Sequence, residues 1–170
     1  MATTLILFSG LPGCGKTTLA RQLASHLNIP LFAKDRFQSL LRQQGLAERA
    51  TTDGYHLMLD MADEQLSLGV SVILDAVFPL PEFREHAAEI ARRHAVRFRP
   101  IYCYCSDEVA WRERLIGRRH VYVPHWTPVG WEEVERIRAF FVPWSPKEAL
   151  FVDAMDGVEE NLAKALMWVM

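Results

Sequence analysis

A glycine-rich segment near the N-terminus, with the spacing Gly, four residues, then Gly-Lys-Thr, carries the strongest chemical signal in the chain. In loops of this kind, glycines let backbone N–H groups converge on phosphate oxygens, and the next helix N-terminus favours negative charge. Lys16 can reach the β- and γ-phosphates, and the Thr17 hydroxyl can bind Mg²⁺. The segment therefore predicts a bound nucleoside triphosphate, held by Gly10, Leu11, Pro12, Gly13, Cys14, Gly15, Lys16, Thr17 and Thr18.

Two acidic residues are candidates for the rest of a phosphoryl transfer, which needs charge neutralisation and often a base for the acceptor hydroxyl. Asp35 follows a short apolar run over residues 29–33, so it should project from the end of a strand. It could act as the base, cap the next helix, or do both. Asp75 ends the apolar run 70–75. An acid there could hold a Mg²⁺-bound water opposite Thr17 or point toward the acceptor.

Arginines in two places could serve the same chemistry. Arg114 and Arg118 are four residues apart, so on a helix they would share one face. They could close over a triphosphate as part of a lid, or belong to a solvated basic face. Arg84 could contact the acceptor, or pair on the surface with Glu85 or Glu89.

Strand and helix patterns alternate along the whole chain, which predicts an α/β fold with a parallel sheet covered by helices on both faces. Ligands of such sheets bind at the carboxyl ends of the strands, which would bring the glycine-rich loop, Asp35 and Asp75 to one edge. Ser106 is a candidate N-cap for a helix over residues 107–116. The expected strands cover 4–8, 29–33, 70–75, 98–105 and 150–153, and further helices follow the loop and cover 35–44, 53–68, 81–94, 130–141 and 158–170.

Length and composition indicate one globular domain over residues 1–170. The net charge of −2 is close to neutral, so no global field would attract nucleic acid or an anionic membrane. Three cysteines, an odd number, and the absence of a signal peptide predict a reducing cytoplasm. Two of them, Cys103 and Cys105, should share one face of a strand as buried thiols, although a metal pair is an alternative. No apolar run reaches membrane-spanning length.

The chain resembles the small P-loop kinases of the adenylate-kinase-like superfamily. It is most similar to the AAA-type ATP-binding proteins related to the kinase domain of polynucleotide kinase, and more distantly to zeta toxins, gluconate kinase and chloramphenicol phosphotransferase. The resemblance covers almost the whole chain and rests on the segments 10–18, 34–36, 74–75 and 81–84 and on Arg114 and Arg118. It implies a three-layer P-loop fold with strand order 2-3-1-4-5 and an arginine-bearing lid near residues 111–130. It also implies that Asp35 is the general base and that Arg114 and Arg118 are the lid arginines.

One position departs from the polynucleotide kinase pattern. Those enzymes carry an arginine three residues after the base, whereas this chain has Gln38. We therefore expect a cytoplasmic kinase that uses ATP and Mg²⁺ to phosphorylate a hydroxyl of a small molecule, with Lys16, Asp35, Arg114 and Arg118 as catalytic residues and Thr17 and Asp75 as metal ligands. The alternatives are a polynucleotide 5′-hydroxyl kinase, and an ATP-binding switch or ATPase that regulates a partner.

Overall fold

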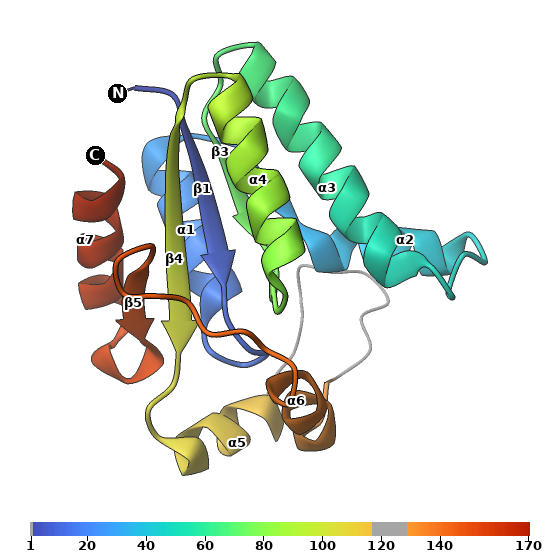
Figure 1. The fold of residues 1–170 in the computed structure, drawn as a ribbon. Coiled ribbons are helices and arrows are strands. Elements are labelled where there is room, and N and C mark those ends of the chain that lie inside the picture. The colour runs from blue at the N-terminus through green and yellow to red at the C-terminus, as the bar shows by residue number, and fades with distance from the viewer. Residues whose placement is uncertain (1, 117–128) are drawn as a thin grey trace.

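Five strands form a single parallel sheet in the computed structural model, which describes residues 2–116 and 129–170 (Figure 1). The strands are β1 (Thr4–Ser9), β2 (Leu31–Ala33), β3 (Val72–Asp75), β4 (Arg97–Tyr104) and β5 (Leu150–Asp153). Their order across the sheet is β2-β3-β1-β4-β5, with every neighbouring pair parallel. The predicted fold class and strand order are confirmed.

Helices cover both faces of this sheet. The described helices are α1 (Lys16–Leu27), α2 (Lys34–Gln43), α3 (Ala50–Ser67), α4 (Pro81–Arg93), α5 (Glu108–Ile116), α6 (Trp131–Arg138) and α7 (Val158–Val169), with a short 3₁₀ turn, η1 (Ala154–Asp156), before the last one. Figure 1 shows α3 and α4 on one face and α1 and α7 on the other. Within the described ranges, no helix combines the length and apolar character needed to span a membrane.

The central strand β1 is buried along its whole length because both of its faces are covered. Successive side chains of a strand point to opposite faces. Leu5 and Leu7 thus belong to the core beneath α3 and α4, whereas Ile6 and Phe8 belong to the core beneath α1 and α7. This double burial fixes the position of the loop that follows β1.

All five strands run in the same direction, so their carboxyl ends meet at one edge of the sheet. Helices α5 and α6 lie beyond this edge, while α2 and α3 form a hairpin that projects to the side of β2 (Figure 1). At Gly54, α3 packs directly on α2, since a Cβ there would be in ordinary van der Waals contact with the backbone nitrogen of Gln38 (3.4 Å) and with Lys34 (3.5 Å).

Two predicted helix starts were wrong in detail. Helix α2 begins at Lys34 with Ala33 as its N-cap, so Asp35 lies inside the first turn and does not cap the helix. Helix α5 is capped by Asp107, whose Oδ1 accepts hydrogen bonds from the backbone nitrogens of Val109 (2.9 Å) and Ala110 (3.0 Å). Ser106 does not have this role, because Asp107 directly precedes the first helical residue and its carboxylate reaches the free N–H groups of the first turn.

Candidate active site

The glycine-rich loop connects β1 to α1 at the carboxyl edge of the sheet. Its path depends on glycine at Gly10, where φ is 140° and a Cβ would lie 2.1 Å from the carbonyl oxygen of Cys103. The same loop is held from the side of β3, because the backbone nitrogen of Gly10 and the hydroxyl of Ser9 both donate to the Val77 carbonyl. The loop is therefore anchored by neighbours on both sides of β1.

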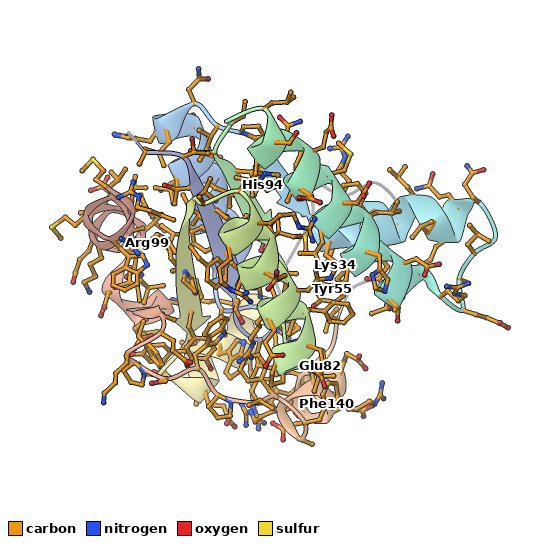
Figure 2. All side chains as sticks on the ribbon, turned by 45° about the horizontal axis from the view of Figure 1, so that its top comes forward. Lys34, Tyr55, Glu82, His94, Arg99 and Phe140 are labelled. Atoms are coloured by element: carbon orange, nitrogen blue, oxygen red, sulfur yellow. The ribbon has the colours of Figure 1, made fainter. Side chains whose placement is uncertain are left out.

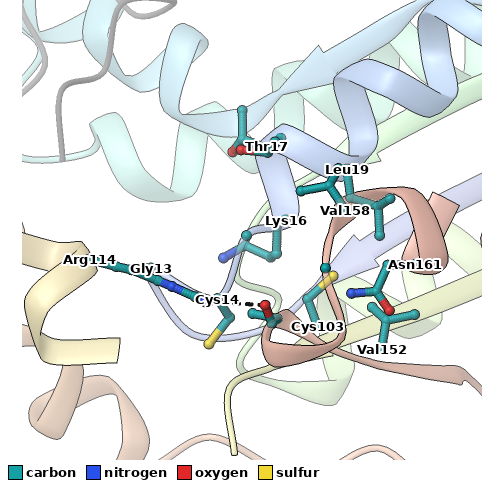
Figure 3. Close-up of a pocket in the computed structure, with 14 residues that line it drawn as sticks. Gly13, Cys14, Lys16, Thr17, Leu19, Cys103, Arg114, Val152, Val158 and Asn161 are labelled. Carbon is teal, nitrogen blue, oxygen red and sulfur yellow. Dashed lines mark hydrogen bonds between the residues drawn. The ribbon is translucent and has the colours of Figure 1, made fainter. Parts of the chain in front are cut away.

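Lys16, the first residue of α1, turns its side chain back into this loop. Its ammonium Nζ donates a hydrogen bond of 2.9 Å to the carbonyl oxygen of Leu11, and the side chain is buried. A phosphate group in the loop would offer this ammonium a charged acceptor in place of a carbonyl, and charge-assisted hydrogen bonds are the stronger kind. Thr17 follows at the start of the same helix (Figure 3).

A cavity of about 480 Å³ opens beside the loop, on the side of β4 and β5 (Figure 3). One wall is the loop and the start of α1, from Gly13 to Leu19. The opposite wall comes from the β5–α7 connection, and includes Ala154, Gly157 and Val158. The volume lies in the range of cofactor and small-ligand sites, so it can accept a nucleotide whose phosphates enter the loop.

The turn η1 borders this cavity and is held by Asp153, the last residue of β5. The Asp153 carboxylate accepts hydrogen bonds from the backbone nitrogens of Ser106 (3.1 Å) and Met155 (3.0 Å). Burial alone would raise the pKa of Asp153, but the Ser106 side chain, these backbone hydrogen bonds and the nearby charge of Arg114 outweigh it, so the net shift is downward. The Asn161 amide donates to the Asp153 carbonyl at 2.6 Å. One buried acid thus joins β5, the start of α5 and the cavity wall.

Arg114 projects from α5 to the same turn. Its Nη1 donates to the Ala154 carbonyl at 3.2 Å, and the side chain lines the cavity (Figure 3). The structure thus places one of the two predicted lid arginines beside the glycine-rich loop. Arg118 and the greater part of the predicted lid lie outside the described residues.

The two acidic candidates lie on the other side of β1. Asp75, at the end of β3, is buried and stands opposite Phe8 of β1 and Ala33 of β2 in the strand register. Asp35 comes two residues after Ala33, and its side chain is 40% exposed. β3 pairs with β1, and β2 pairs with the far side of β3, so the carboxyl ends of both strands lie at the same edge of the sheet as the loop. The loop, Asp35 and Asp75 thus come from the same edge of the sheet, as the topology rule predicted.

Sequence reasoning missed Lys34, a buried lysine directly before Asp35. Its ammonium lies 2.8 Å from Oδ1 of Asp35 and 2.5 Å from Oε1 of Gln38, over the ring of Tyr55 (Figure 2). The Gln38 amide donates in turn to the Thr51 hydroxyl at 2.8 Å. Both ends of Gln38 are therefore engaged within the protein. A lysine next to an acid at a strand end was the available sequence signal.

Arg84 does not form the surface pair with Glu85 or Glu89 that was one of its two predicted roles. It is buried, and its guanidinium donates to the carbonyls of Phe78 (2.7 Å) and Val142 (2.7 Å) while lying against the rings of Phe141 and Trp144. Burial lowers its pKa. Arg84 ties the start of α4 to the segment after α6, a contact between residues 58 positions apart that the sequence pattern does not contain.

The three cysteines are free thiols, and two of them lie at the cavity. Cys103 is buried as predicted, whereas Cys105 is only partly buried because β4 ends before it. Burial raises the pKa of Cys14 to about 11. Cys14 therefore stays neutral at physiological pH and adds no negative charge to the loop. Within the described ranges no group of three His, Cys, Asp or Glu side chains is arranged to hold a metal ion.

Comparison with known proteins identifies one family whose sequence profile matches this chain and several solved structures with a similar fold. The sequence profile of an AAA domain family matches residues 5–143. A candidate kinase from Chloroflexus aurantiacus superposes with a TM-score of 0.76 at 23% identity over the whole of both chains. A gluconokinase from Sinorhizobium meliloti 1021 gives 0.68 at 17% identity, covering 98% of this chain and 90% of the other. The Mycobacterium tuberculosis APS kinase CysC, solved with AMPPNP and APS, gives 0.70 at 17% identity, covering 98% and 97%. No curated protein matches the chain.

Proposed function

We propose, from the premise that this chain belongs to the AAA domain family and has the fold of the small P-loop kinases, that it transfers the γ-phosphate of ATP to a hydroxyl group of a small molecule. In this reaction the acceptor oxygen bonds to the γ-phosphorus, the bond from that phosphorus to the β,γ-bridging oxygen breaks, and ADP leaves. The hydroxyl proton passes to Asp35 or to water. Lys16 and the loop amides hold the phosphates.

The observation that carries this proposal is that β1 and the loop after it divide the edge of the sheet into two sides. The cavity beside the loop lies over β4 and β5, whereas Asp75 is the last residue of β3 and Asp35 comes shortly after β2. Since β1 separates these pairs of strands, the loop stands between a space for a nucleotide and a pair of carboxylates. A donor site on one side and a base on the other is the arrangement that phosphoryl transfer requires.

The available oxygen ligands fit a magnesium ion. Mg²⁺ in phosphoryl-transfer sites is usually held by one or two protein oxygens together with phosphates and waters, so it needs no cluster of acidic residues. The Thr17 hydroxyl and the Asp75 carboxylate would be its protein ligands. The ion would neutralise charge on the phosphates, while Asp35 orients or deprotonates the acceptor hydroxyl.

A small-molecule acceptor is favoured over a nucleic acid by the net charge of the chain and by Gln38, which stands where polynucleotide kinases carry an arginine. The chain has a net charge of −2, so no global positive field would attract a polyanion. Gln38 accepts from Lys34 and donates to Thr51. These contacts hold the Lys34–Asp35 pair. Gluconokinase and APS kinase, which share the fold, are named for small acceptors.

The test is a screen for acceptor-stimulated ADP release with sugars, sugar acids, nucleosides, hydroxylated antibiotics and 5′-hydroxyl oligonucleotides. We expect at least one small molecule to stimulate release, with a new phosphate monoester in the ³¹P NMR spectrum. Lys16→Ala should abolish the stimulation, and Lys147→Ala, at an exposed lysine, should preserve it. Transfer to oligonucleotides alone, or ADP release that no acceptor alters, would contradict the proposal.

A further inference from the structure

Trp111 of α5 makes a buried hydrogen bond to the glycine-rich loop. Its indole Nε1 donates to the carbonyl oxygen of Pro12 at 2.8 Å, and only 5% of the residue is exposed. The two residues are 99 positions apart in the chain. A buried carbonyl that loses its donor is left unsatisfied, so this bond restrains the Pro12 peptide unit strongly.

Peptide geometry converts this restraint into a direction for the next N–H group. The chain has no cis peptide among its described residues. In a trans peptide the C=O and the following N–H point in opposite directions. With the Pro12 carbonyl directed at the indole, the N–H of Gly13 is directed away from Trp111, and it would be offered to a phosphate oxygen bound in the loop.

The close packing of Trp111 against the loop leaves no room for a side chain larger than that of glycine at position 13. A Cβ at Gly13 would lie 2.8 Å from the indole Nε1 and 2.9 Å from Leu115 Cδ2, and φ there is 87°. Glycine at position 13 therefore does more than permit a positive φ. It also lets α5 come close to the Pro12–Gly13 peptide, which Trp111 of α5 orients.

Trp111 also links the loop to α6. Its ring packs edge-on against Trp131 with centroids 5.1 Å apart, and the Arg138 guanidinium lies 5.0 Å from the Trp111 ring and 5.2 Å from the Trp131 ring. Arg138 also forms an ion pair with Glu108 at the start of α5. The indole that holds Pro12 is thus packed against α6 as well.

We propose that Trp111 is a positioning residue for the nucleotide phosphates: it aims the Gly13 N–H and couples the loop to α5 and α6. This inference rests on the proposed function, since it concerns how the same loop binds ATP. The indole touches no reacting atom and acts through the Pro12–Gly13 peptide.

The test compares Trp111→Phe with Trp131→Phe by calorimetric titration of the parent and variants with Mg·AMPPNP. Phenylalanine keeps an aromatic ring at position 111 but removes the donor, so we expect binding about tenfold weaker. Trp131→Phe removes no hydrogen bond to the loop and should bind within about twofold of the parent. Equal affinity of Trp111→Phe and the parent would overturn the inference.

A spectroscopic measurement on the unmutated chain remains decisive if Trp111→Phe fails to fold. The chain has five tryptophans, whose indole N–H signals can be assigned by NMR through side-chain correlations. We expect the Trp111 signal and the Gly13 amide signal to shift together as Mg·AMPPNP is added, with a small response from Trp168. A Trp111 signal that stays in place while Gly13 shifts would refute the coupling. Lys16→Ala distinguishes this failure from a failure of the proposed function. If the proposed function is wrong, Lys16→Ala will bind Mg·AMPPNP with the same affinity as the parent.

Discussion

The ammonium group of Lys34 lies 2.8 Å from the carboxylate of Asp35, and Gln38 holds that ammonium from its other side. The proposed base is therefore one half of an ion pair, at a site where the carboxylate is partly exposed and the lysine is buried. An ion pair of this kind holds the Asp35 carboxylate in one orientation. It suits a carboxylate that accepts a hydrogen bond from the acceptor hydroxyl during transfer.

Asp35→Asn should abolish most phosphoryl transfer while leaving nucleotide binding intact. The amide keeps the shape of the side chain but cannot accept a proton, and general bases contribute about 10²- to 10⁴-fold to rate. We expect kcat with the identified acceptor to fall by about that factor, and Mg·AMPPNP affinity to stay within about twofold. Asp60→Asn, at an exposed site on α3, is the control and should keep full activity. Comparable kcat for Asp35→Asn and the parent would exclude Asp35 as the base.

Arg114→Ala should lower the catalytic efficiency with ATP, because Arg114 lines the cavity and contacts the η1 turn through Ala154. Loss of the guanidinium removes both a positive charge near the phosphates and a support for the cavity wall. We expect kcat/KM for ATP to fall by about 10- to 100-fold. The control is Arg136→Ala, which removes an exposed arginine paired with Glu133 on α6. Matching losses in the two variants would point to a general charge effect.

Arg84→Lys should destabilise the fold almost as much as Arg84→Ala. The guanidinium bonds two carbonyls on different segments and stacks against two rings, and a lysine cannot reproduce this planar set of donors. Urea unfolding should show a loss of about 2–4 kcal/mol, since the buried Phe78 carbonyl and the part-buried Val142 carbonyl both lose their donor. Arg92→Ala, which breaks an exposed pair with Glu89, should cost less than about 1 kcal/mol. A loss of less than about 1 kcal/mol in the Arg84 variants would show that Arg84 does not stabilise the contact between α4 and the segment after α6.

The free energy of unfolding should fall as pH rises from about 9 to about 11. The Cys14 thiol ionises near pH 9.0 in the unfolded chain, but burial raises its pKa to about 11 in the folded protein. The folded state therefore holds this proton more tightly, and that advantage is present below pH 9 and lost as pH passes through the folded pKa. Urea titrations at pH 8 and pH 10.5 measure the fall. Cys14→Ala should reduce it, and an identical fall in that variant would show that Cys14 does not contribute.

The glycine-rich loop, the alternation of strands and helices, and the polar strand ends could all be predicted from the sequence because they depend on local spacing. Periodicity and glycine placement set β1, the loop and α1, and the topology rules for parallel sheets then bring Asp35 and Asp75 to the edge where that loop lies. The details of helix ends were less predictable. Asp107 and Ser106 are adjacent, and only the first-turn geometry shows which one caps α5.

The partners of the site residues were decided by the tertiary structure alone. Trp111 reaches Pro12 and Arg84 reaches Val142 across 99 and 58 positions of sequence, and no periodic pattern encodes such distances. Lys34 is recognisable as a site residue only in the folded chain, where α2 and α3 pack together and bury it beside Tyr55 and Gln38. The sequence by itself determined a phosphate-binding loop at the edge of a parallel sheet. Long-range packing decided which side chains hold that loop and its neighbouring carboxylate in place, because buried polar groups must find partners wherever the fold brings them.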